Sequence, residues 1–211
     1  ILNHPKVDDY DLSSLIDIGA GGAARPEDQV KELNDKFNIP LTFGWGMTET
    51  SAIGTIHRGD DYLTRPNSCG LNVPYLTELS VIDNNWKFLK TNDVGEIVFK
   101  SPTNMTGYLK NTDETLKTKK DGWLKTGDLG YIDEDGYLFI VDRKKALIIR
   151  GGENISTLEI ENCLDKHNDI LESCVCGIPN DKFGEIVGVL IYSNNSIDEE
   201  NVKNFLSKSL A

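Results

Sequence analysis

The amino-acid sequence predicts a mixed α/β and α+β protein built from three successive parts. Two short apolar runs that stop at glycine, with an amphipathic helix between them, predict a parallel α/β unit over residues 1–60. Short strand-like segments separated by turn residues predict a distorted, barrel-like antiparallel β region over residues 66–142. Two helix start signals among further strand-like segments predict a small α+β domain over residues 146–211, with the boundary at residues 143–145.

In the parallel unit, the first strand is expected at Leu15–Ile18 and the second at Ile39–Phe43. Pro26 and the acidic residues after it mark the start of the connecting helix, because proline and negative charge both favour a helix N-terminus. Ligands of parallel sheets bind at the carboxyl ends of the strands. The glycine segments that follow the two strands therefore form the first candidate site.

The antiparallel region is expected to contain four short strands, at residues 77–83, 95–100, 123–133 and 137–142. Asp133–Gly136 is typical of a hairpin turn, and Thr112–Lys119 is the one helical segment expected between the strands. In the small domain, the capping boxes Ser156–Glu159 and Ser196–Glu199 predict two helices. Its strands are expected at residues 173–177 and 186–192.

The composition limits the class of protein. The 211 residues are 38% hydrophobic and 27% charged, which excludes a disordered chain and a membrane protein. The formal net charge is −12, and an acidic chain repels nucleic-acid backbones, so we expect no nucleic-acid partner. The four cysteines lack C-x-x-C spacing, which favours a reduced, cytoplasmic protein. We expect Cys174 and Cys176 to be small, buried apolar residues of a strand.

Gly19–Ala24 fits the dinucleotide-binding pattern G-x-G-x-x-A. However, Pro26 delays the helix start, so these glycines do not lie at a helix N-terminus, and no acidic residue ends the second strand to bind a ribose. Two interpretations stay open: a tight turn without a ligand, or a turn that lets the backbone approach a flat ring.

Residues 44–50 combine residue types that suit a nucleotide. The two glycines of this segment free the backbone around Trp45, whose ring could stack on a base. A hydroxyl and a carboxylate follow at Thr48 and Glu49, and they suit a phosphate oxygen and Mg²⁺. The alternative is the end of a strand followed by a helix that Thr48 or Thr50 caps.

Asp128 and Arg143 are two further candidates. Gly127 and Asp128 interrupt a strand-like segment, which happens mainly at a bulge or where a ligand approaches. A carboxylate there could accept hydrogen bonds from two ribose hydroxyls or from nearby backbone amides. Arg143 begins a basic cluster, and its guanidinium suits ribose and phosphate oxygens. The alternative is a solvated linker between domains.

Four separated segments, taken together, resemble the acyl-adenylate-forming superfamily of acyl-CoA synthetases, adenylation domains and luciferases. The segments are Gly21–Ala23, Gly44–Glu49, Asp121–Asp128 and Tyr137–Asn154. Asn104–Tyr108 and Glu159–Glu161 match as well, and the motifs follow the family's order over nearly the whole chain. The Arg-Lys-Lys and Gly-Gly-Glu-Asn variants in the last segment are most similar to fatty or medium-chain acyl-CoA ligases.

The resemblance implies an ATP and AMP site made of Gly21, Gly22, Ala23, Gly44, Trp45, Gly46, Met47, Thr48, Asp128 and Arg143. Trp45 would take the place of a stacking aromatic ring. Thr48 would touch phosphate and Glu49 would hold Mg²⁺, so these two residues are the catalytic candidates. Asp128 would accept the ribose hydroxyls, and Arg143 would contact ribose or phosphate.

A two-step reaction is also implied by the resemblance. A carboxylate, expected to be a fatty acid, would attack the α-phosphate of ATP to give acyl-AMP and pyrophosphate, and the thiol of CoA would then displace AMP. Lys145 would be the hinge between the two domains. CoA would be bound by Gly151, Gly152 and Glu153, with the two glycines lining the pantetheine passage. The expected cofactors are ATP, Mg²⁺ and coenzyme A.

The resemblance covers only the C-terminal portion of the family's chain. The family's phosphate loop and C-terminal catalytic lysine should lie outside residues 1–211, so we expect the fragment alone to be inactive. An adenylation domain that loads a carrier protein and a non-catalytic nucleotide-binding module stay open as alternatives. Peripheral membrane association through the acyl substrate also stays open, and the sequence indicates no oligomeric state.

Overall fold

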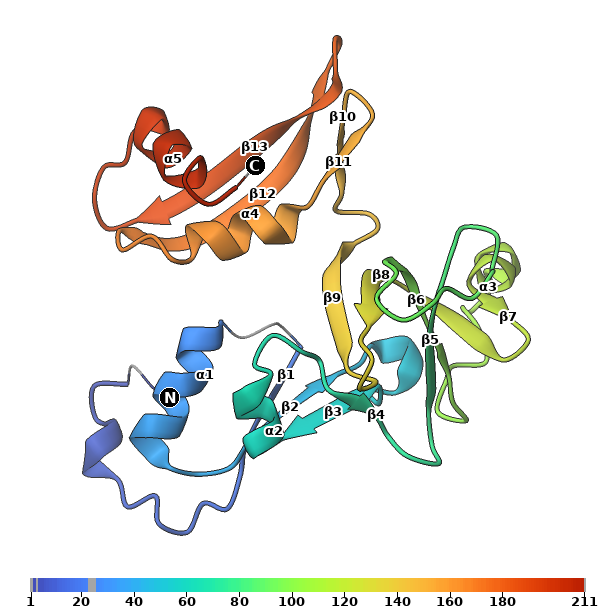
Figure 1. Cartoon of the computed structure of the whole chain (residues 1–211), viewed down its shortest axis with the longest axis horizontal. Helices are drawn as coiled ribbons and strands as arrows, with labels where there is room; N and C mark the ends of the chain where they lie inside the picture. The colour runs from blue at the N-terminus through green and yellow to red at the C-terminus, as the bar shows by residue number, and fades with distance from the viewer. Residues whose placement is uncertain (1, 3, 23–25, 211) are drawn as a thin grey trace. The chain divides into compact units, whose positions relative to one another are not determined.

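The computed structural model describes residues 2, 4–22 and 26–210, which form two compact units (Figure 1). Unit 1 comprises Ile1–Thr126 and Gly130–Ile140, and unit 2 comprises Gly127–Leu129 and Val141–Ala211. Residues 127–129 thus belong to unit 2 although they lie in the middle of a strand, Trp123–Ile132, whose two ends belong to unit 1. From Val141 onward the chain belongs to unit 2. The sequence-based boundary at residues 143–145 stays a prediction.

Unit 1 begins with a four-stranded sheet in the order β1 (Ile18–Gly21), β2 (Leu41–Trp45), β3 (Thr55–Arg58) and β4 (Leu71–Asn72). β1 and β2 are parallel and α1 (Glu27–Phe37) connects them, which confirms the predicted α/β unit. β3 and β4 continue the sheet in antiparallel fashion. Ile18 pairs with Leu41 and Gly21 pairs with Gly44, so β1 and β2 end at the same edge of the sheet.

The first strand lies later in the chain than predicted. Leu15–Ile16 precede β1, and both side chains are exposed. Hydrophobicity alone does not make a strand, because the backbone needs a partner. Pairing with the neighbouring strand β2 begins only at Ile18, whose N–H donates to the Pro40 carbonyl at 2.9 Å. Gly19–Gly21 therefore belong to the strand, and the left-handed turn residue is Gly22, with φ +86°.

The second sheet of unit 1 has the order β5 (Glu78–Ile82), β6 (Gly95–Lys100), β8 (Trp123–Ile132) and β7 (Lys119–Lys120), and β9 (Leu138–Arg143) pairs with β8. This is the curled antiparallel region that the sequence predicts (Figure 1). α3 (Thr112–Thr118) is the expected helix, whereas α2 (Asp60–Thr64) was not predicted. The core of unit 1 contains Val30, Leu33, Leu41, Phe43, Tyr62, Cys69, Ile97 and Leu138.

Unit 2 is a four-stranded antiparallel sheet in the order β11 (Glu153–Ile155), β10 (Ile148–Arg150), β13 (Gly184–Ser193) and β12 (Ile170–Asn180). Its helices are α4 (Thr157–Leu164) and α5 (Glu199–Leu206). The two helices and the sheet enclose a core of Ile148, Ile160, Leu164, Ile170, Val175 and Val202. This arrangement is the small α+β domain that the sequence predicts.

One of the two predicted helix caps of unit 2 is confirmed and the other is wrong. Ser156 caps α4 as expected, since its hydroxyl accepts a hydrogen bond from the Glu159 N–H at 3.1 Å. The prediction that Ser196 caps α5 is wrong. Asp198 is the cap, and its carboxylate accepts from the Asn201 N–H at 2.7 Å. Both residue types can cap a helix, so packing of the helix face decides which one does.

The prediction that Cys174 and Cys176 are buried is also wrong, because both side chains are exposed. They alternate along β12 with Val175, which is buried in the core formed with α4 and α5. Successive strand residues point to opposite faces, so the two cysteines lie on the face that these helices leave uncovered. Cys69 and Cys163 are buried, and the four cysteines are thiols.

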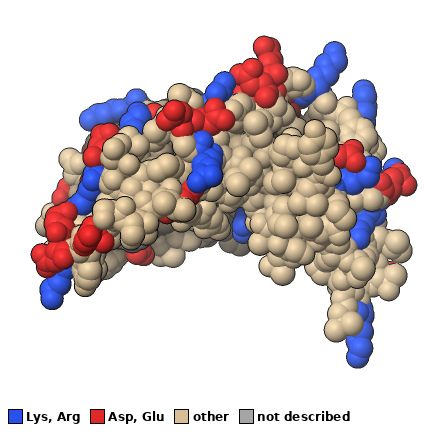
Figure 2. Space-filling view, turned by 90° about the horizontal axis from the view of Figure 1, so that it is seen from below, with Lys and Arg blue, Asp and Glu red and all other residues tan. Residues whose placement is uncertain are grey.

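No helix among the described residues is long and apolar enough to cross a membrane. On the face seen in Figure 2, acidic and basic side chains are interspersed.

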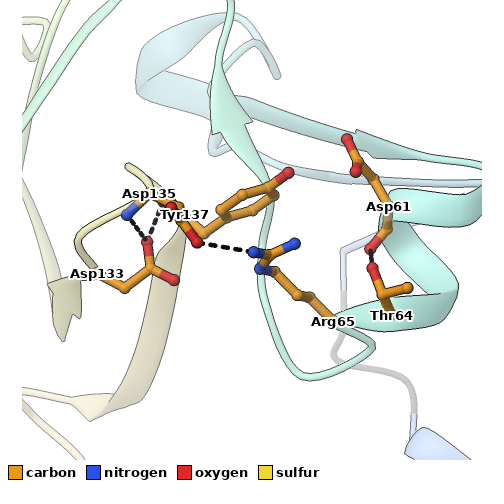
Figure 3. Close-up of polar contacts among 6 residues, drawn as sticks. All are labelled: Asp61, Thr64, Arg65, Asp133, Asp135 and Tyr137. Carbon is orange, nitrogen blue, oxygen red and sulfur yellow. Dashed lines mark hydrogen bonds and ion pairs between the residues drawn. The ribbon is translucent and has the colours of Figure 1, made fainter.

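A polar cluster joins the segment after α2 to the β8–β9 turn in unit 1 (Figure 3). The Arg65 guanidinium lies 4.3 Å from the centre of the Tyr137 ring and donates to the Asp135 carboxylate at 2.8 Å. The Asp133 carboxylate accepts from the backbone N–H groups of Asp135 and Tyr137 and so closes the predicted hairpin turn. Burial raises the pKa of Tyr137, and a hydrogen bond with Asp61 adds to this shift.

His57 lies beside this cluster on β3 and is buried. Its ring lies 5.3 Å from the rings of both Tyr62 and Tyr137, measured between centroids. Neither ring nitrogen has a hydrogen-bond partner among the described residues. Burial lowers the pKa of His57, although the backbone of Ser68 and the charge of Asp61 oppose the shift. Burial therefore disfavours the charged form of the imidazole in the folded protein.

Candidate functional site

The glycine segments predicted to face a ligand lie side by side at one edge of the first sheet. Gly21 and Gly44 are paired residues of the parallel strands β1 and β2. A Cβ atom on Gly21 would lie 3.1 Å from the Gly44 carbonyl oxygen, so a larger residue would crowd this edge. Gly21 and Gly22 are exposed, which leaves their backbone accessible. Ala23 lies outside the described residues, so its predicted place beside an adenine stays a prediction.

The segment after β2 folds back on itself tightly. A Cβ atom on Gly46 would lie 2.6 Å from the Ala52 carbonyl oxygen, and one on Gly54 would lie 2.2 Å from the Trp45 carbonyl oxygen. Both positions therefore require glycine, because neighbouring backbone atoms leave no room for a side chain. Trp45 is half-buried and lies edge-on to Phe99, with 6.0 Å between ring centroids. Its predicted stacking on a base stays a prediction.

The residues after Gly46 form a single 3₁₀ turn, Thr48–Thr50, and the next element is the strand β3 rather than the α-helix of the alternative interpretation. Thr50 is fully buried, and its hydroxyl accepts from the Met47 N–H at 3.1 Å and donates to the Met47 carbonyl at 3.0 Å. Thr50 thus closes the turn. The closed turn leaves Thr48 exposed and Glu49 half-buried, directly beyond the carboxyl end of β2.

A segment far along the chain contacts this turn. We call residues 104–108 the strap. The Met105 N–H donates to the Glu49 carbonyl at 2.7 Å, and the Tyr108 hydroxyl donates to Glu49 Oε1 at 2.9 Å. Just before the strap, the Ser51 hydroxyl donates to the Thr103 carbonyl at 2.9 Å. The strap therefore fixes both the backbone and the side chain of Glu49.

The strap itself is anchored to α3 and β7. The Tyr108 N–H donates to the Thr115 hydroxyl at 2.9 Å, and Gly107 packs so closely that a Cβ atom there would lie 2.7 Å from Thr115 Cγ2. The Lys119 ammonium donates to the carbonyls of Met105 and Thr106. Burial raises the pKa of Tyr108, and the hydrogen bond and charge of Glu49 raise it further, so its hydroxyl stays a donor.

Asp128 and Arg143, which were predicted to contact ribose and phosphate, lie close together in the structure. They belong to the segments of β8 and β9 that are part of unit 2. Asp128 is buried in β8, and the Arg143 guanidinium at the end of β9 lies 3.5 Å from its Oδ1. Gly127 precedes Asp128 with φ +76°, and its carbonyl accepts from the Lys144 N–H at 2.8 Å. The irregularity expected at this glycine is thus present, and it presents a buried carboxylate beside an exposed guanidinium.

The remaining predicted residues lie in two exposed turns of unit 2. Lys145 is exposed in a turn closed by a hydrogen bond from the Ala146 N–H to the Arg143 carbonyl at 2.9 Å. Gly151 and Gly152 join β10 to β11 with φ values of +62° and +94°. Glu153 follows as the first residue of β11. The roles of Lys145 as a hinge and of the glycine turn in CoA binding stay predictions.

The donor set at Glu49 fits magnesium better than zinc. Among the described residues, no group of three or more histidine, cysteine, aspartate or glutamate side chains could hold a metal ion alone. Magnesium often takes one or two carboxylates and completes its shell with water and substrate phosphates. Glu49 can supply one such carboxylate, because the Tyr108 hydrogen bond uses only its Oε1, and the preceding residue Thr48 is exposed.

Sequence comparison shows which family this chain belongs to. Residues 1–109 match the family model described as AMP-binding enzyme, so the chain is a member of the AMP-binding enzyme family. It is 37% identical to a luciferin 4-monooxygenase of Luciola mingrelica over 217 residues, covering 100% of this chain and 39% of the relative. It is also 37% identical to a 2-succinylbenzoate–CoA ligase of Bacillus cereus (strain AH820) over 199 residues, covering 94% of this chain and 41% of the relative.

A third relative is a long-chain-fatty-acid–CoA ligase of Bacillus subtilis, 34% identical over 214 residues, of which the chain covers 38%. Among solved structures, an o-succinylbenzoate CoA synthetase of Bacillus subtilis bound to its acyl-adenylate intermediate has a TM-score of 0.85 at 29% identity. That match covers 92% of this chain and 40% of the synthetase. The chain thus spans about two fifths of the length of these relatives.

Proposed function

We propose that this chain is part of an ATP-dependent acyl-CoA ligase, which activates a carboxylate as acyl-AMP and transfers the acyl group to CoA. The observation that carries the proposal is the turn Thr48–Thr50. In a chain of the AMP-binding enzyme family, it places an exposed hydroxyl and an anchored carboxylate beyond the strand edge where Gly21 and Gly44 meet. Ligands bind at such edges of parallel strands.

Each candidate residue has a role in this proposal that its surroundings support. The Thr48 hydroxyl would donate to a phosphate oxygen, and the Glu49 carboxylate would hold Mg²⁺. When bound, the ion supplies positive charge against the phosphates of ATP. The Asp128 carboxylate would accept hydrogen bonds from the ribose hydroxyls, with the Arg143 guanidinium at 3.5 Å orienting it and contacting ribose or phosphate.

The reaction would proceed in two displacements at these residues. A carboxylate oxygen attacks the α-phosphorus of ATP, the bond to the β-phosphate breaks, and acyl-AMP and pyrophosphate form. The CoA sulfur then attacks the acyl carbon, AMP leaves, and the thiol proton is released. Lys145 would be the hinge for the second step, and Gly151, Gly152 and Glu153 would contact CoA. The glycine turn is exposed and carries no side chain to obstruct a pantetheine arm.

We include a fatty acid as the substrate in this proposal. The long-chain-fatty-acid–CoA ligase of Bacillus subtilis supports it, whereas the other relatives described above carry the names of different carboxylates. The four thiols support a reducing compartment, so the proposed location is the cytoplasm.

The full-length protein should be incubated with ATP, Mg²⁺, CoA and a panel of carboxylates: short, medium and long fatty acids and o-succinylbenzoate. We expect acyl-CoA together with AMP and pyrophosphate, and the highest kcat/KM for a fatty acid. Thioester formation fastest with o-succinylbenzoate would refute the substrate but retain the reaction. Failure to form any thioester, with AMP still released, would point to an acceptor other than CoA.

A further inference from the structure

The contact between Tyr108 and Glu49 joins residues that lie 59 positions apart in the sequence. Tyr108 Oη lies 2.9 Å from Glu49 Oε1, and both side chains are half-buried. A phenol that donates to one carboxylate oxygen restricts rotation about the last bond of the glutamate side chain. The second oxygen, Oε2, then has a defined direction even before a cation arrives.

The backbone on both sides of this contact is held independently of it. The Met105 N–H donates to the Glu49 carbonyl at 2.7 Å, and the Tyr108 N–H donates to the Thr115 hydroxyl at 2.9 Å. Lys119 fixes the carbonyls of Met105 and Thr106. The strap therefore stays attached to the turn when the tyrosine hydroxyl alone is removed, which makes that hydroxyl available for a clean test.

We infer that Tyr108 is a positioning residue for Glu49, and that its hydroxyl orients the carboxylate so that Oε2 can bind the magnesium of Mg·ATP. This inference rests on the proposed function, because that proposal makes Glu49 the magnesium ligand. Tyr108 itself touches neither the ion nor the nucleotide in this account. Its contribution is preorganisation, which lowers the conformational cost that the glutamate side chain bears on binding.

A purely architectural role for Tyr108 predicts something different. If the hydroxyl served only to attach the strap, its removal would destabilise unit 1 and leave the affinity of the folded protein for divalent metal unchanged. If it positions Glu49, the metal affinity of the folded protein falls. The two roles therefore separate in a binding measurement made on folded protein.

The test uses the full-length protein and the variant Tyr108→Phe, with Mn²⁺·ATP as a spectroscopic probe read by electron paramagnetic resonance. We expect the dissociation constant of Mn²⁺·ATP to rise about threefold to tenfold, because binding must then order the glutamate side chain that the tyrosine hydroxyl no longer holds. In carboxylate-dependent pyrophosphate release, the Mg²⁺ concentration for half-maximal rate should rise by a similar factor, while kcat at saturating Mg²⁺ changes little.

Two matched variants control this test. Tyr131→Phe removes a phenol hydroxyl from another ring of unit 1, one that stacks on Phe139 at 5.0 Å, and it should leave Mn²⁺·ATP binding unchanged. Thr115→Val loosens the strap without touching the Tyr108 hydroxyl, and it should lower stability more than metal affinity. Equal rises in the Mn²⁺·ATP dissociation constant for Thr115→Val and Tyr108→Phe would show that strap attachment is what matters, and would overturn the inference.

The outcomes also distinguish this inference from the proposed function. If the wild-type protein releases pyrophosphate but Tyr108→Phe has the same Mg²⁺ dependence and Mn²⁺·ATP affinity, the inference is wrong and the proposed function stands. If the wild-type protein binds Mn²⁺·ATP, the variant binds it more weakly and neither releases pyrophosphate, the inference stands and the proposed function falls. Failure of the wild-type protein to bind Mn²⁺·ATP would overturn both.

Discussion

The turn that carries Glu49 in unit 1 and the glycine turn of unit 2 both depend on glycine, but for different physical reasons. In unit 1, Gly46 and Gly54 are needed because a Cβ atom at either position would lie too close to a backbone carbonyl oxygen. The distances would be 2.6 Å for Gly46 and 2.2 Å for Gly54. In unit 2, a Cβ atom on Gly152 would meet no described atom within 4 Å, but φ is +94°. The glycines of the first turn are required by packing, whereas Gly152 in the second is required only by its own backbone conformation.

This difference matches what each turn is proposed to do. A turn that positions a carboxylate for a metal ion benefits from a rigid backbone, because catalytic groups must keep their geometry closely. A turn that an acyl acceptor passes must instead be accessible, and an open glycine turn on the surface meets that need. Substitutions in the two turns should therefore differ in their effect on stability.

The largest effect is expected for Gly54→Ala. The new methyl group would collide with the Trp45 carbonyl and ring, which are held by the surrounding core, so we expect a loss of about 3 kcal/mol or more in the free energy of unfolding of unit 1. Urea denaturation followed by tryptophan fluorescence reports on unit 1, because Trp45, Trp86 and Trp123 all lie there. Gly19→Ala is the control, since its methyl group would meet no described atom within 4 Å. Equal losses for both variants would contradict the packing account.

Asp128→Ala should raise the KM for ATP in the full-length protein about tenfold to a hundredfold, the effect of losing a hydrogen bond to a charged group. Glu134→Ala is the matched control, because Glu134 is an exposed residue of the β8–β9 turn. Steady-state kinetics with varied ATP would measure the effect. If the two variants had the same KM for ATP, Asp128 would not be a ribose ligand.

For Gly152→Ala we expect a loss of about 1–2 kcal/mol in the stability of unit 2, which is the cost of placing a non-glycine residue at positive φ. Hydrogen exchange of the β12 and β13 amides would detect it, while the fluorescence transition of unit 1 should not move. A destabilisation as large as that of Gly54→Ala would mean that this turn is also closely packed.

A smaller effect should appear in the pH dependence of unit 1. Burial lowers the pKa of His57 in the folded state, with Tyr62, Tyr137, Asp61 and Arg65 around it. Between the unfolded value of about 6.5 and this lower pKa, the unfolded chain binds more protons, so stability falls as pH falls, by at most about 1.4 kcal/mol per pH unit.

His57→Leu should flatten that dependence in fluorescence-monitored urea denaturation between pH 7 and pH 5. Parallel stability–pH curves for the wild-type protein and His57→Leu would show that other groups control the acid sensitivity of unit 1.

The sequence predicted those parts of the fold and site that follow from local patterns. Gly21 and Gly44 end two apolar runs, so their meeting at one sheet edge was predictable. Asp128 was singled out because glycine and aspartate are unusual inside a strand. Thr48, Glu49 and Arg143 were candidates because a hydroxyl, a carboxylate and a guanidinium suit phosphate, Mg²⁺ and ribose oxygens, and the order of the family's motifs supported them.

Other features depend on packing between distant segments, which no local pattern reports. The prediction that Cys174 and Cys176 are buried failed, because strand alternation does not say which face of a sheet the helices cover. Ser196 and Asp198 are both good helix caps, and only the docked helix shows that Asp198 is used. The hydrogen bond from Tyr108 to Glu49 spans 59 positions, so the family match of the strap gave no indication of its role.

Product analysis without an acyl acceptor tests directly whether the protein forms an acyl-adenylate. The full-length protein should be incubated with α-labelled ATP, Mg²⁺ and a fatty acid but without CoA, and the labelled products separated by chromatography. We expect acyl-AMP and pyrophosphate that form only with the carboxylate, and loss of acyl-AMP in Glu49→Gln. Labelled ADP, or AMP formed equally well without carboxylate, would contradict it.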